Sequence, residues 1–247
     1  MSEPVHFERR GAVALVTIDR PERRNAVDHD ALEQLTVAID RASTAVPETR
    51  VLVLTGAAGH FCAGADLTGL EDAGFASVLR GVLDRLREAP MPTIAAVEGA
   101  ALGAGCQLAI ACDLRVASPN ARFGIPAARL GLMVDHWTVQ RLAILAGHGP
   151  ARGVLLAADV LDGDAAVRLG LAQRTGDLDD ALAWADDISR LAPLTIQGHK
   201  LMLNRLEPDI GHDVDVAAAF KRAWDSNDLR EGLTAFHERR SPDFRGE

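Results

Sequence analysis

Two stretches of small residues, each lying between a predicted strand and a predicted helix, have the composition needed to hold a reacting carbonyl oxygen. They span residues 56–67 (GAAGHFCAGADL) and 98–108 (EGAALGAGCQL). Backbone N–H groups in the first turn of a helix have no partner within that helix. The small side chains of Ala63, Gly64 and Ala65 let a ligand approach the backbone closely. A thioester carbonyl that becomes an oxyanion needs two such donors, so the pair of stretches predicts an oxyanion pocket.

Cysteine and histidine show no catalytic or metal-binding pattern in this chain. Cys62, Cys106 and Cys112 have no CxxC spacing and no His partners in a zinc-binding pattern. We therefore expect neither disulfides nor a metal site, and a reducing, cytoplasmic setting. We interpret Cys62 as a small buried residue and His136 as a capping or surface residue.

The composition indicates a folded protein that does not bind nucleic acid or span a membrane. Hydrophobic residues make up 48% of the 247 residues, and the net charge is −9. This charge argues against a nucleic-acid partner, although local arginines can still bind phosphate. The longest apolar stretch, residues 93–114, is interrupted by Glu98, Gln107 and several glycines, so we expect a core segment there. The first residues, MSEPVHFERRG, contain no apolar segment typical of a signal peptide.

The first half of the chain alternates strand and helix patterns, which indicates a parallel sheet with helical crossovers. Apolar and β-branched runs predict strands at residues 13–18, 51–55, 93–97 and 113–117. Between the first two, Asp28 has the position of a helix N-cap. The apolar face of that helix would comprise Leu32, Leu35, Ile39 and Ala42.

The second half is predicted to contain helices alone and to continue the same domain without a linker. The pattern indicates a helix that begins after Asp135 and ends at Ala146, a helix opening after Pro150, and a helix after Asp164. Another starts near Asp177 and carries Leu178, Leu182, Ile188 and Leu191, followed by helices over residues 195–203 and 214–224. Their apolar faces exceed what one small core needs, which indicates self-association.

A series of motifs runs through nearly the whole chain. They are Arg20-Pro21 with Asn25-Ala26, residues 61–66 (FCAGAD), Gly99 with residues 103–108 (GAGCQL), Cys112-Asp113, residues 122–124 (RFG), residues 140–142 (QRL), Ala192-Pro193 with Lys200, and Phe236 with residues 239–244 (RRSPDF). In order and spacing this series resembles the enoyl-CoA hydratase/isomerase (crotonase) family. The resemblance implies a single α/β domain over residues 1–247. That domain would comprise a spiral of ββα units over residues 1–190 and a helical trimerisation region over residues 191–247, which forms a homotrimer or a hexamer made of two trimers.

The same resemblance implies an acyl-coenzyme A ligand and no permanently bound cofactor. The oxyanion donors would be the backbone amides of Ala65 and Ala104. The coenzyme would lie along Arg23, Arg24 and Ala26, with its adenine near Ala63, Ala65 and Asp66. Arginine makes charge-assisted contacts to phosphate, although a basic turn of this kind is also compatible with a solvated surface.

The two glutamates that hydratases of this family use are absent. One activates water and the other delivers a proton at Cα; the resemblance places Gln107 and Ala127 at their positions. Neither side chain exchanges a proton near neutral pH. Each general acid–base group typically contributes ~10²–10⁴-fold, so we expect little hydration. Simple isomerases of the family rely on the second position, so Ala127 also argues against that activity.

Asp135 is the remaining carboxylate of interest. It stands where the family's dienoyl-CoA isomerases and aryl-CoA dehalogenases carry a catalytic aspartate. It is equally suited to cap a helix that begins at His136. The glutamate that partners it in the isomerases is missing at Ala127, and residues 75–87 contain no His for the dehalogenase reaction. Trp137 is compatible with an acyl tunnel but is more typical of a core residue.

Three functional hypotheses follow. The leading one is an acyl-CoA binding protein without hydratase activity, a carrier or regulator in fatty-acid and lipid metabolism with a possible protein partner in that metabolism. The second is an enzyme that uses Asp135 as an acid–base residue in isomerisation or a related proton transfer. The third is an inactive structural subunit that binds no acyl-CoA.

Overall fold

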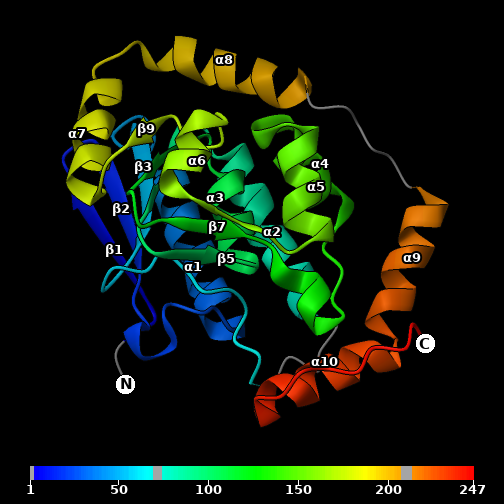
Figure 1. The fold of residues 1–247 in the computed structure, drawn as a ribbon. Helices are drawn as coiled ribbons and strands as arrows, with labels where there is room; N and C mark the ends of the chain where they lie inside the picture. Colours follow the sequence, from blue (N-terminus) through cyan, green and yellow to red (C-terminus); the bar gives the residue numbers. More distant parts are fainter. Residues whose placement is uncertain (1–2, 69–73, 207–212) are drawn as a thin grey trace.

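A six-stranded sheet forms the centre of the fold in the computed structural model, which describes residues 3–68, 74–206 and 213–247 (Figure 1). Its strands lie in the order β1 (Val5–Arg10), β2 (Val13–Ile18), β3 (Val51–Gly56), β4 (Thr93–Val97), β6 (Leu114–Ala117) and β9 (Arg174–Thr175). The β1–β2 pair is antiparallel and the other neighbours are parallel. The predicted α/β class with a parallel sheet is confirmed.

The inner strands are mainly apolar because helices cover both faces of the sheet. Side chains alternate between the faces along each strand. One face packs against α7 (Leu178–Ser189) and buries a cluster that includes Val13, Leu15, Val51, Val53, Ile94 and Ala96. The other face belongs to the main core, which includes α1 (His29–Thr44), and buries Ala14, Val16, Ile18, Leu52, Leu54 and Val97.

A second, three-stranded sheet lies beside the first. Its strands are β5 (Ala100–Leu102), β7 (Arg122–Gly124) and β8 (Val160–Asp162), with β5–β7 parallel and β7–β8 antiparallel. The sequence did not indicate β5, which lies inside the glycine-rich stretch at residues 99–105. The prediction of helices alone in the second half was wrong, because β8 and β9 both lie there. Strands of two or three residues are too short for a periodic pattern.

Helices surround the two sheets (Figure 1). Besides α1 and α7 they are η1 (Pro21–Arg23), α2 (Gly74–Glu88), α3 (Ala104–Ala111), η2 (Pro126–Leu130), α4 (His136–Ala146), α5 (His148–Leu156), α6 (Gly163–Arg168), α8 (Pro193–Leu206), α9 (Val214–Trp224) and α10 (Asn227–Glu238). The sequence pattern did not predict α10. The described helices include none with the length and hydrophobicity of a membrane-crossing segment.

Most of the predicted element boundaries are confirmed. Strands β2 and β4 and helices α4 and α9 match exactly, and Asp28 and Asp177 cap α1 and α7 through their side chains. Three helix starts were wrong. The helix predicted over residues 195–203 spans Pro193–Leu206 as α8. Helix α5 begins at His148, so Pro150 lies within its first turn, where a missing N–H has no cost. Helix α6 is capped by Asp162, so Asp164 lies inside it.

Helix α8 is attached to the body through a buried lysine and through Asn204, whose amide donates to the Arg87 carbonyl oxygen at 2.9 Å. Lys200 is only 7% exposed, and its Nζ donates to the Asp113 carboxylate at 2.7 Å and to the Met91 carbonyl oxygen at 3.0 Å. Asp113 also accepts the Thr93 N–H at 2.8 Å, at the start of β4. These contacts give Lys200 a structural role.

We predict that Lys200→Met lowers the free energy of unfolding by about 2–3 kcal/mol, because it leaves the partly buried Asp113 carboxylate without its cation. Lys221→Met is the matched control, since Lys221 is the chain's other lysine and pairs with Asp225 on the exposed side of α9. An exposed pair of this type contributes about 0.3–0.5 kcal/mol. Urea denaturation measures both; equal losses for the two variants would contradict the role given to Lys200.

Candidate functional site

The two glycine-rich stretches pair with each other and form one backbone surface. The Cys62 N–H donates to the Ala100 carbonyl oxygen at 2.7 Å, and the Leu102 N–H donates to the Cys62 carbonyl oxygen at 3.0 Å. A Cβ atom at Gly105 would lie 2.1 Å from that same Cys62 oxygen. Only glycine therefore lets the start of α3 approach the first stretch this closely.

The amides of Ala65 and Ala104 both belong to this surface. Val27 pairs with the two neighbours of Ala65: it donates to the Gly64 carbonyl oxygen at 2.9 Å and accepts the Asp66 N–H at 2.8 Å. In a parallel pairing the N–H of the intervening residue points away from the partner. Ala104 is the first residue of α3, so its N–H has no acceptor within the helix. Within the described residues neither amide donates a hydrogen bond, and both residues line one cavity.

The charges at the far end of α3 favour an anion at its start. The helix ends next to Arg115, whose fully buried guanidinium donates to the carbonyl oxygens of Cys112 (2.7 Å) and Ala109 (3.3 Å). Arg141 donates to the Ile110 carbonyl oxygen at 3.0 Å. Burial lowers the pKa of Arg115 to about 10, so it stays charged near neutral pH. The negative end of the helix dipole is thus compensated, and its positive end faces the cavity at Ala104.

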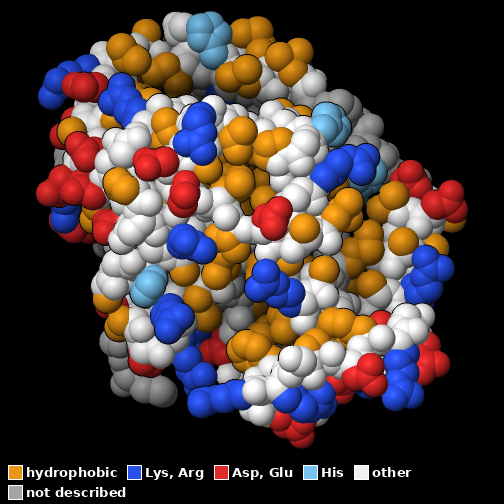
Figure 2. Space-filling view, viewed as in Figure 1, with side chains coloured by type: hydrophobic (Ala, Val, Ile, Leu, Met, Phe, Trp, Pro, Cys, Tyr) orange, Lys and Arg blue, Asp and Glu red, His pale blue; other side chains and the backbone are white. Residues whose placement is uncertain are grey.

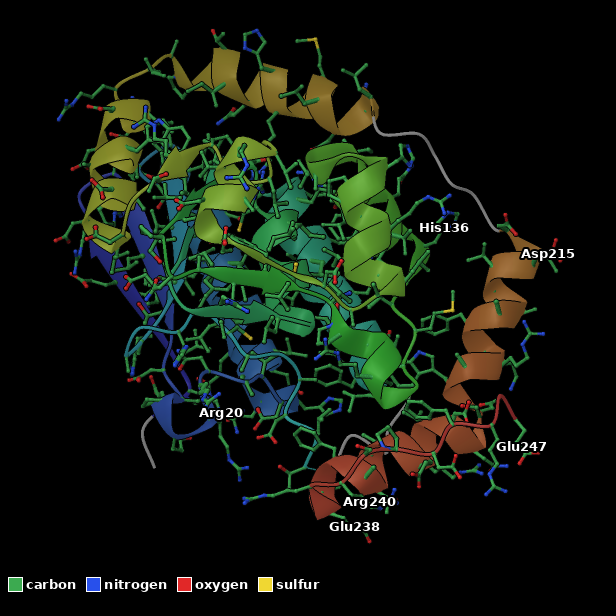
Figure 3. All side chains as sticks on the ribbon, viewed as in Figure 1. Arg20, His136, Asp215, Glu238, Arg240 and Glu247 are labelled. Atoms are coloured by element: carbon green, nitrogen blue, oxygen red, sulfur yellow. The ribbon has the colours of Figure 1, made fainter. Side chains whose placement is uncertain are left out.

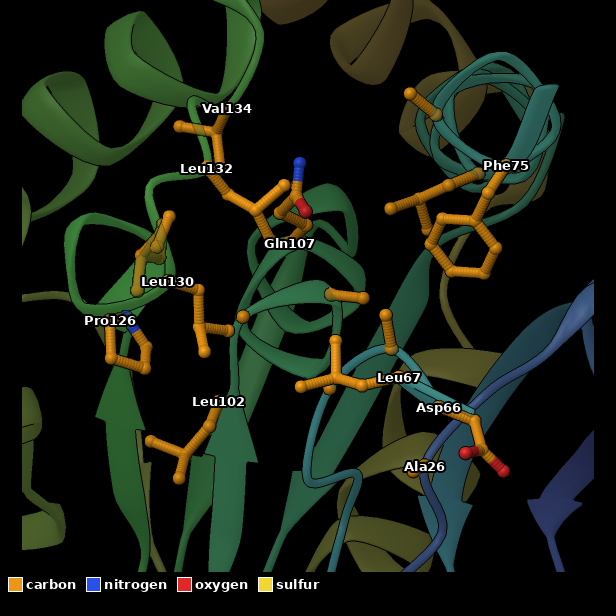
Figure 4. Close-up of a pocket in the computed structure, with 18 of the residues that line it drawn as sticks. Ala26, Asp66, Leu67, Phe75, Leu102, Gln107, Pro126, Leu130, Leu132 and Val134 are labelled. Carbon is orange, nitrogen blue, oxygen red and sulfur yellow. The ribbon is translucent and has the colours of Figure 1, made fainter. Parts of the chain in front are cut away.

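The cavity has a volume of about 580 Å³ and walls that are mainly hydrocarbon. In the close-up, Gln107 lies between Leu132 and Val134 on one side and Phe75 on the other, while Ala26 and Asp66 lie towards the opposite end (Figure 4). Hydrophobic side chains also gather between the body and the two last helices on the face seen in Figure 2. The described apolar lining includes Leu67, Phe75, Leu79, Leu83, Leu102, Ile125, Leu130, Leu132, Met133, Val134, Phe220, Trp224 and Phe236.

Most residues predicted to contact the coenzyme line this cavity. They are Arg23, Ala26, Ala63, Ala65 and Asp66. Arg24 lies beside them instead, in the left-handed conformation that ends η1, where its carbonyl oxygen accepts the Ala63 N–H at 3.0 Å.

Two side chains hold these predicted coenzyme-contacting residues, the strip at the cavity mouth, in place. Sequence analysis assigned no role to either side chain. Arg20, beside η1 (Figure 3), forms ion pairs with Asp28 at 2.6 Å and Asp66 at 3.2 Å. Asn25 is fully buried and accepts the Arg20 N–H at 2.8 Å, while its amide donates to the Ala57 carbonyl oxygen at 2.8 Å. The one sequence signal for a role of Arg20 and Asn25 was that both belong to the series of motifs that resembles the family.

The electrostatic surroundings keep Asp66 ionised. Burial acts against its charge, but hydrogen bonds from Thr68 and the charges of Arg23 and Arg20 outweigh burial and lower the pKa of Asp66. The Arg23 guanidinium also lies 3.5 Å from the Thr68 hydroxyl. The mouth of the cavity thus combines one anchored carboxylate with a more exposed arginine.

The two positions that the resemblance assigns to catalytic glutamates both line the cavity. Gln107 follows Ala104 by one turn of α3, is 7% exposed, and donates from Nε2 to the Thr138 hydroxyl at 2.8 Å. Ala127, in η2, contributes only a methyl group. Neither position presents an ionisable group to a bound thioester.

Asp135 both caps a helix and lines the cavity. Its Oδ1 accepts the Thr138 N–H at 2.9 Å, which confirms the predicted N-cap of α4. Its Oδ2 lies 3.3 Å from Arg80 of α2, which also pairs with Asp84 and lies over the Trp137 ring at 4.5 Å. Burial disfavours the charge of Arg80, but the two carboxylates outweigh it and raise the Arg80 pKa.

The remaining candidates lie outside the cavity. Trp137 is buried in the core, and His136 lies at the start of α4 (Figure 3) without lining the cavity. Burial raises the pKa of Cys62 to about 12, which leaves it an unreactive thiol near neutral pH. Among the described residues, no group of His, Cys, Asp or Glu has the arrangement of a metal site.

Comparison with known proteins agrees with this geometry. The sequence model of the family described as enoyl-CoA hydratase/isomerase matches residues 8–247. A probable enoyl-CoA hydratase of Mycobacterium leprae is 44% identical over 246 residues, covering 95% of this chain and 96% of its own. The 2,3-dehydroadipyl-CoA hydratase of Escherichia coli is 35% identical over 257 residues, covering 100% of each chain. A crystal structure of methylmalonyl-CoA decarboxylase superimposes with a TM-score of 0.91 at 25% identity and full coverage of both chains.

Proposed function

Because the chain belongs to the enoyl-CoA hydratase/isomerase family, we propose that it binds acyl-coenzyme A thioesters without hydrating them. The observation that carries this proposal is the pair of unpaired amides at Ala65 and Ala104 beside Gln107 and Ala127. The amides supply hydrogen bonds to a thioester oxygen. The two neighbouring positions supply no proton donor or acceptor that titrates near neutral pH. Ligand capture and turnover thus depend on different atoms of the same cavity.

The strip at the cavity mouth supports coenzyme binding. Arg23 is partly free to contact phosphate, while Ala26 and Ala63 leave room for a flat ring beside the backbone. Arg20 and Asn25 fix this backbone from behind, so the strip does not need to reorganise when the ligand arrives. Arg24, which lies beside the residues that line the cavity, remains a candidate for a contact to a coenzyme phosphate.

A second candidate function is proton transfer by Asp135, which its position in the cavity favours. Its Oδ2 lies 3.3 Å from the Arg80 guanidinium, and an ionised carboxylate is the form that removes a proton. The same contact holds the carboxylate towards α2. Asp135→Asn separates the two functions, because asparagine caps a helix as well as aspartate does and removes only the charge.

The first experiment follows the absorbance of conjugated 2-enoyl-CoAs and, in parallel, their binding by calorimetry. We expect saturable binding, no loss of absorbance above the rate in water, and unchanged binding in Asp135→Asn. Turnover at ordinary enzyme rates that disappears in Asp135→Asn would establish the second function. Absence of binding to any thioester would contradict both and leave a structural subunit.

We further propose that the protein acts as a carrier or regulator in fatty-acid metabolism, in the cytoplasm, as a homotrimer or hexamer. Large apolar side chains on and before α8 support self-association through residues 191–247, because they are exposed in the single chain (Figure 2). They are Leu191, Leu194, Leu201, Met202, Leu203 and Leu206. Sedimentation velocity tests this point, and a monomer at micromolar concentration would exclude it.

A further inference from the structure

The cavity extends past the amide pair to the C-terminal helices, and its far wall is aromatic. Phe220 and Trp224 follow each other by one turn of α9, and their ring centroids lie 5.7 Å apart. Both residues line the cavity. No described residue of α9 is buried in the core. Helix α9 therefore directs its aromatic face towards the cavity, and a ligand that fills the cavity would bury that face.

The Trp224 indole is one polar group of this wall, which also includes His237, and it already has a partner. The Trp224 indole N–H donates to the Met133 carbonyl oxygen at 2.9 Å, which also ties α9 to the loop before α4. The wall thus offers a ligand hydrocarbon and ring surface, and no free hydrogen-bonding group at Trp224.

Two of the polar or charged side chains deep in the cavity, Gln107 and Arg80, already have partners within the described structure. Gln107 donates to Thr138 at 2.8 Å. The positive charge of Arg80 is matched by Asp84 and Asp135. A carboxylate on the acyl chain would therefore meet a cation that is already neutralised, next to the negative Asp135. Burying an ionised group without a partner is strongly unfavourable.

From these contacts we infer that the site selects acyl-CoAs whose chain is uncharged hydrocarbon and long enough to reach Phe220 and Trp224. This inference rests on the proposed acyl-CoA binding and specifies its ligand class. Short acyl groups fill only the region near Ala104, and chains ending in a carboxylate are excluded. The specificity differs from that stated in the name of the Escherichia coli relative, whose 2,3-dehydroadipyl group carries a terminal carboxylate.

The test is a calorimetric titration with acetyl-, butyryl-, octanoyl- and dodecanoyl-CoA, together with octanedioyl-CoA as the carboxylate-ended match for octanoyl-CoA. We expect affinity to rise by roughly fourfold per added methylene until the chain reaches α9, which corresponds to ~0.8 kcal/mol for each buried CH₂. Octanedioyl-CoA should bind roughly 100-fold more weakly than octanoyl-CoA.

Substitutions in the aromatic wall test where the end of the acyl chain lies. Phe220→Ala should weaken dodecanoyl-CoA binding by roughly tenfold or more and leave acetyl-CoA binding unchanged. Phe244→Ala, outside the cavity lining, is the matched control. Long acyl-CoAs should shift tryptophan emission to shorter wavelength as Trp224 leaves water, acetyl-CoA should not, and Trp224→Phe should remove the shift.

The outcomes separate this inference from the proposed function. Saturable binding of every thioester with no dependence on chain length, or equal affinities for octanoyl- and octanedioyl-CoA, would overturn the inference and leave acyl-CoA binding intact. Failure of acetyl-CoA and all longer thioesters to bind would overturn the proposed function and the inference together.

Discussion

Replacing Gln107 and Ala127 together with glutamate is expected to give the protein a hydration activity of at least ~10²-fold above the native chain. Both side chains line the cavity, and Gln107 follows the Ala104 amide by one helical turn. Gln107→Glu changes shape little, and Thr138 remains as its hydrogen-bonding partner. The double variant therefore adds the missing proton-transfer groups to an amide pair that is already in place. Loss of absorbance of 2-enoyl-CoA measures the result.

Two controls make this experiment decisive. Gln107→Glu combined with Ala127→Gln has the same bulk in the cavity but one carboxylate fewer, so it should stay near the native rate. Thioester binding by each variant shows that the cavity is intact. If the double glutamate variant binds thioesters and still fails to hydrate them, the missing glutamates are not what separates this chain from a hydratase.

Gly105→Ala is expected to lower the free energy of unfolding by about 3 kcal/mol and to abolish thioester binding. The added methyl group would lie 2.1 Å from the Cys62 carbonyl oxygen and 2.8 Å from the Cys62 carbonyl carbon. These are backbone atoms, so one of the two stretches has to move. Movement of either stretch separates the amides of Ala65 and Ala104. Thermal unfolding and calorimetric titration measure the two effects.

Gly149→Ala provides the matched substitution. Gly149 lies in the first turn of α5, and a Cβ atom there meets nothing within 4 Å. Alanine favours the helical conformation over glycine, so stability should stay constant or rise by up to about 1 kcal/mol. If Gly105→Ala and Gly149→Ala behaved alike, close contact between the two stretches would not be what Gly105 provides.

The buried framework was the part of the fold that the sequence could predict. Residues 13–18 and 93–97 form strands as expected, because burial on both faces demands an uninterrupted apolar run. Strand β1 escaped prediction because it is a half-exposed edge that mixes charged and apolar residues. Strands β5, β7, β8 and β9 were missed because two or three residues are too few to show a periodic pattern.

The candidate site was predictable where it depends on local backbone and not where it depends on distant side chains. Local composition pointed to the two backbone stretches and to a cap at Asp135, and the family resemblance pointed to the amides of Ala65 and Ala104. The pairing of Asp135 with Arg80 joins residues 55 positions apart and follows no sequence pattern. The fully buried Arg115 was missed for the same reason, because the carbonyl oxygens that satisfy it exist only in the folded chain.

The paired loops also determine which mutations this cavity tolerates. Its hydrogen-bond donors are peptide nitrogens, which every residue except proline possesses. Substitutions at positions 65 and 104 therefore alter the space around a ligand and leave the donors in place. A side chain used for proton transfer, by contrast, is lost in a single codon change. Ligand binding in such a cavity therefore survives more substitutions than a reaction that depends on a single side chain.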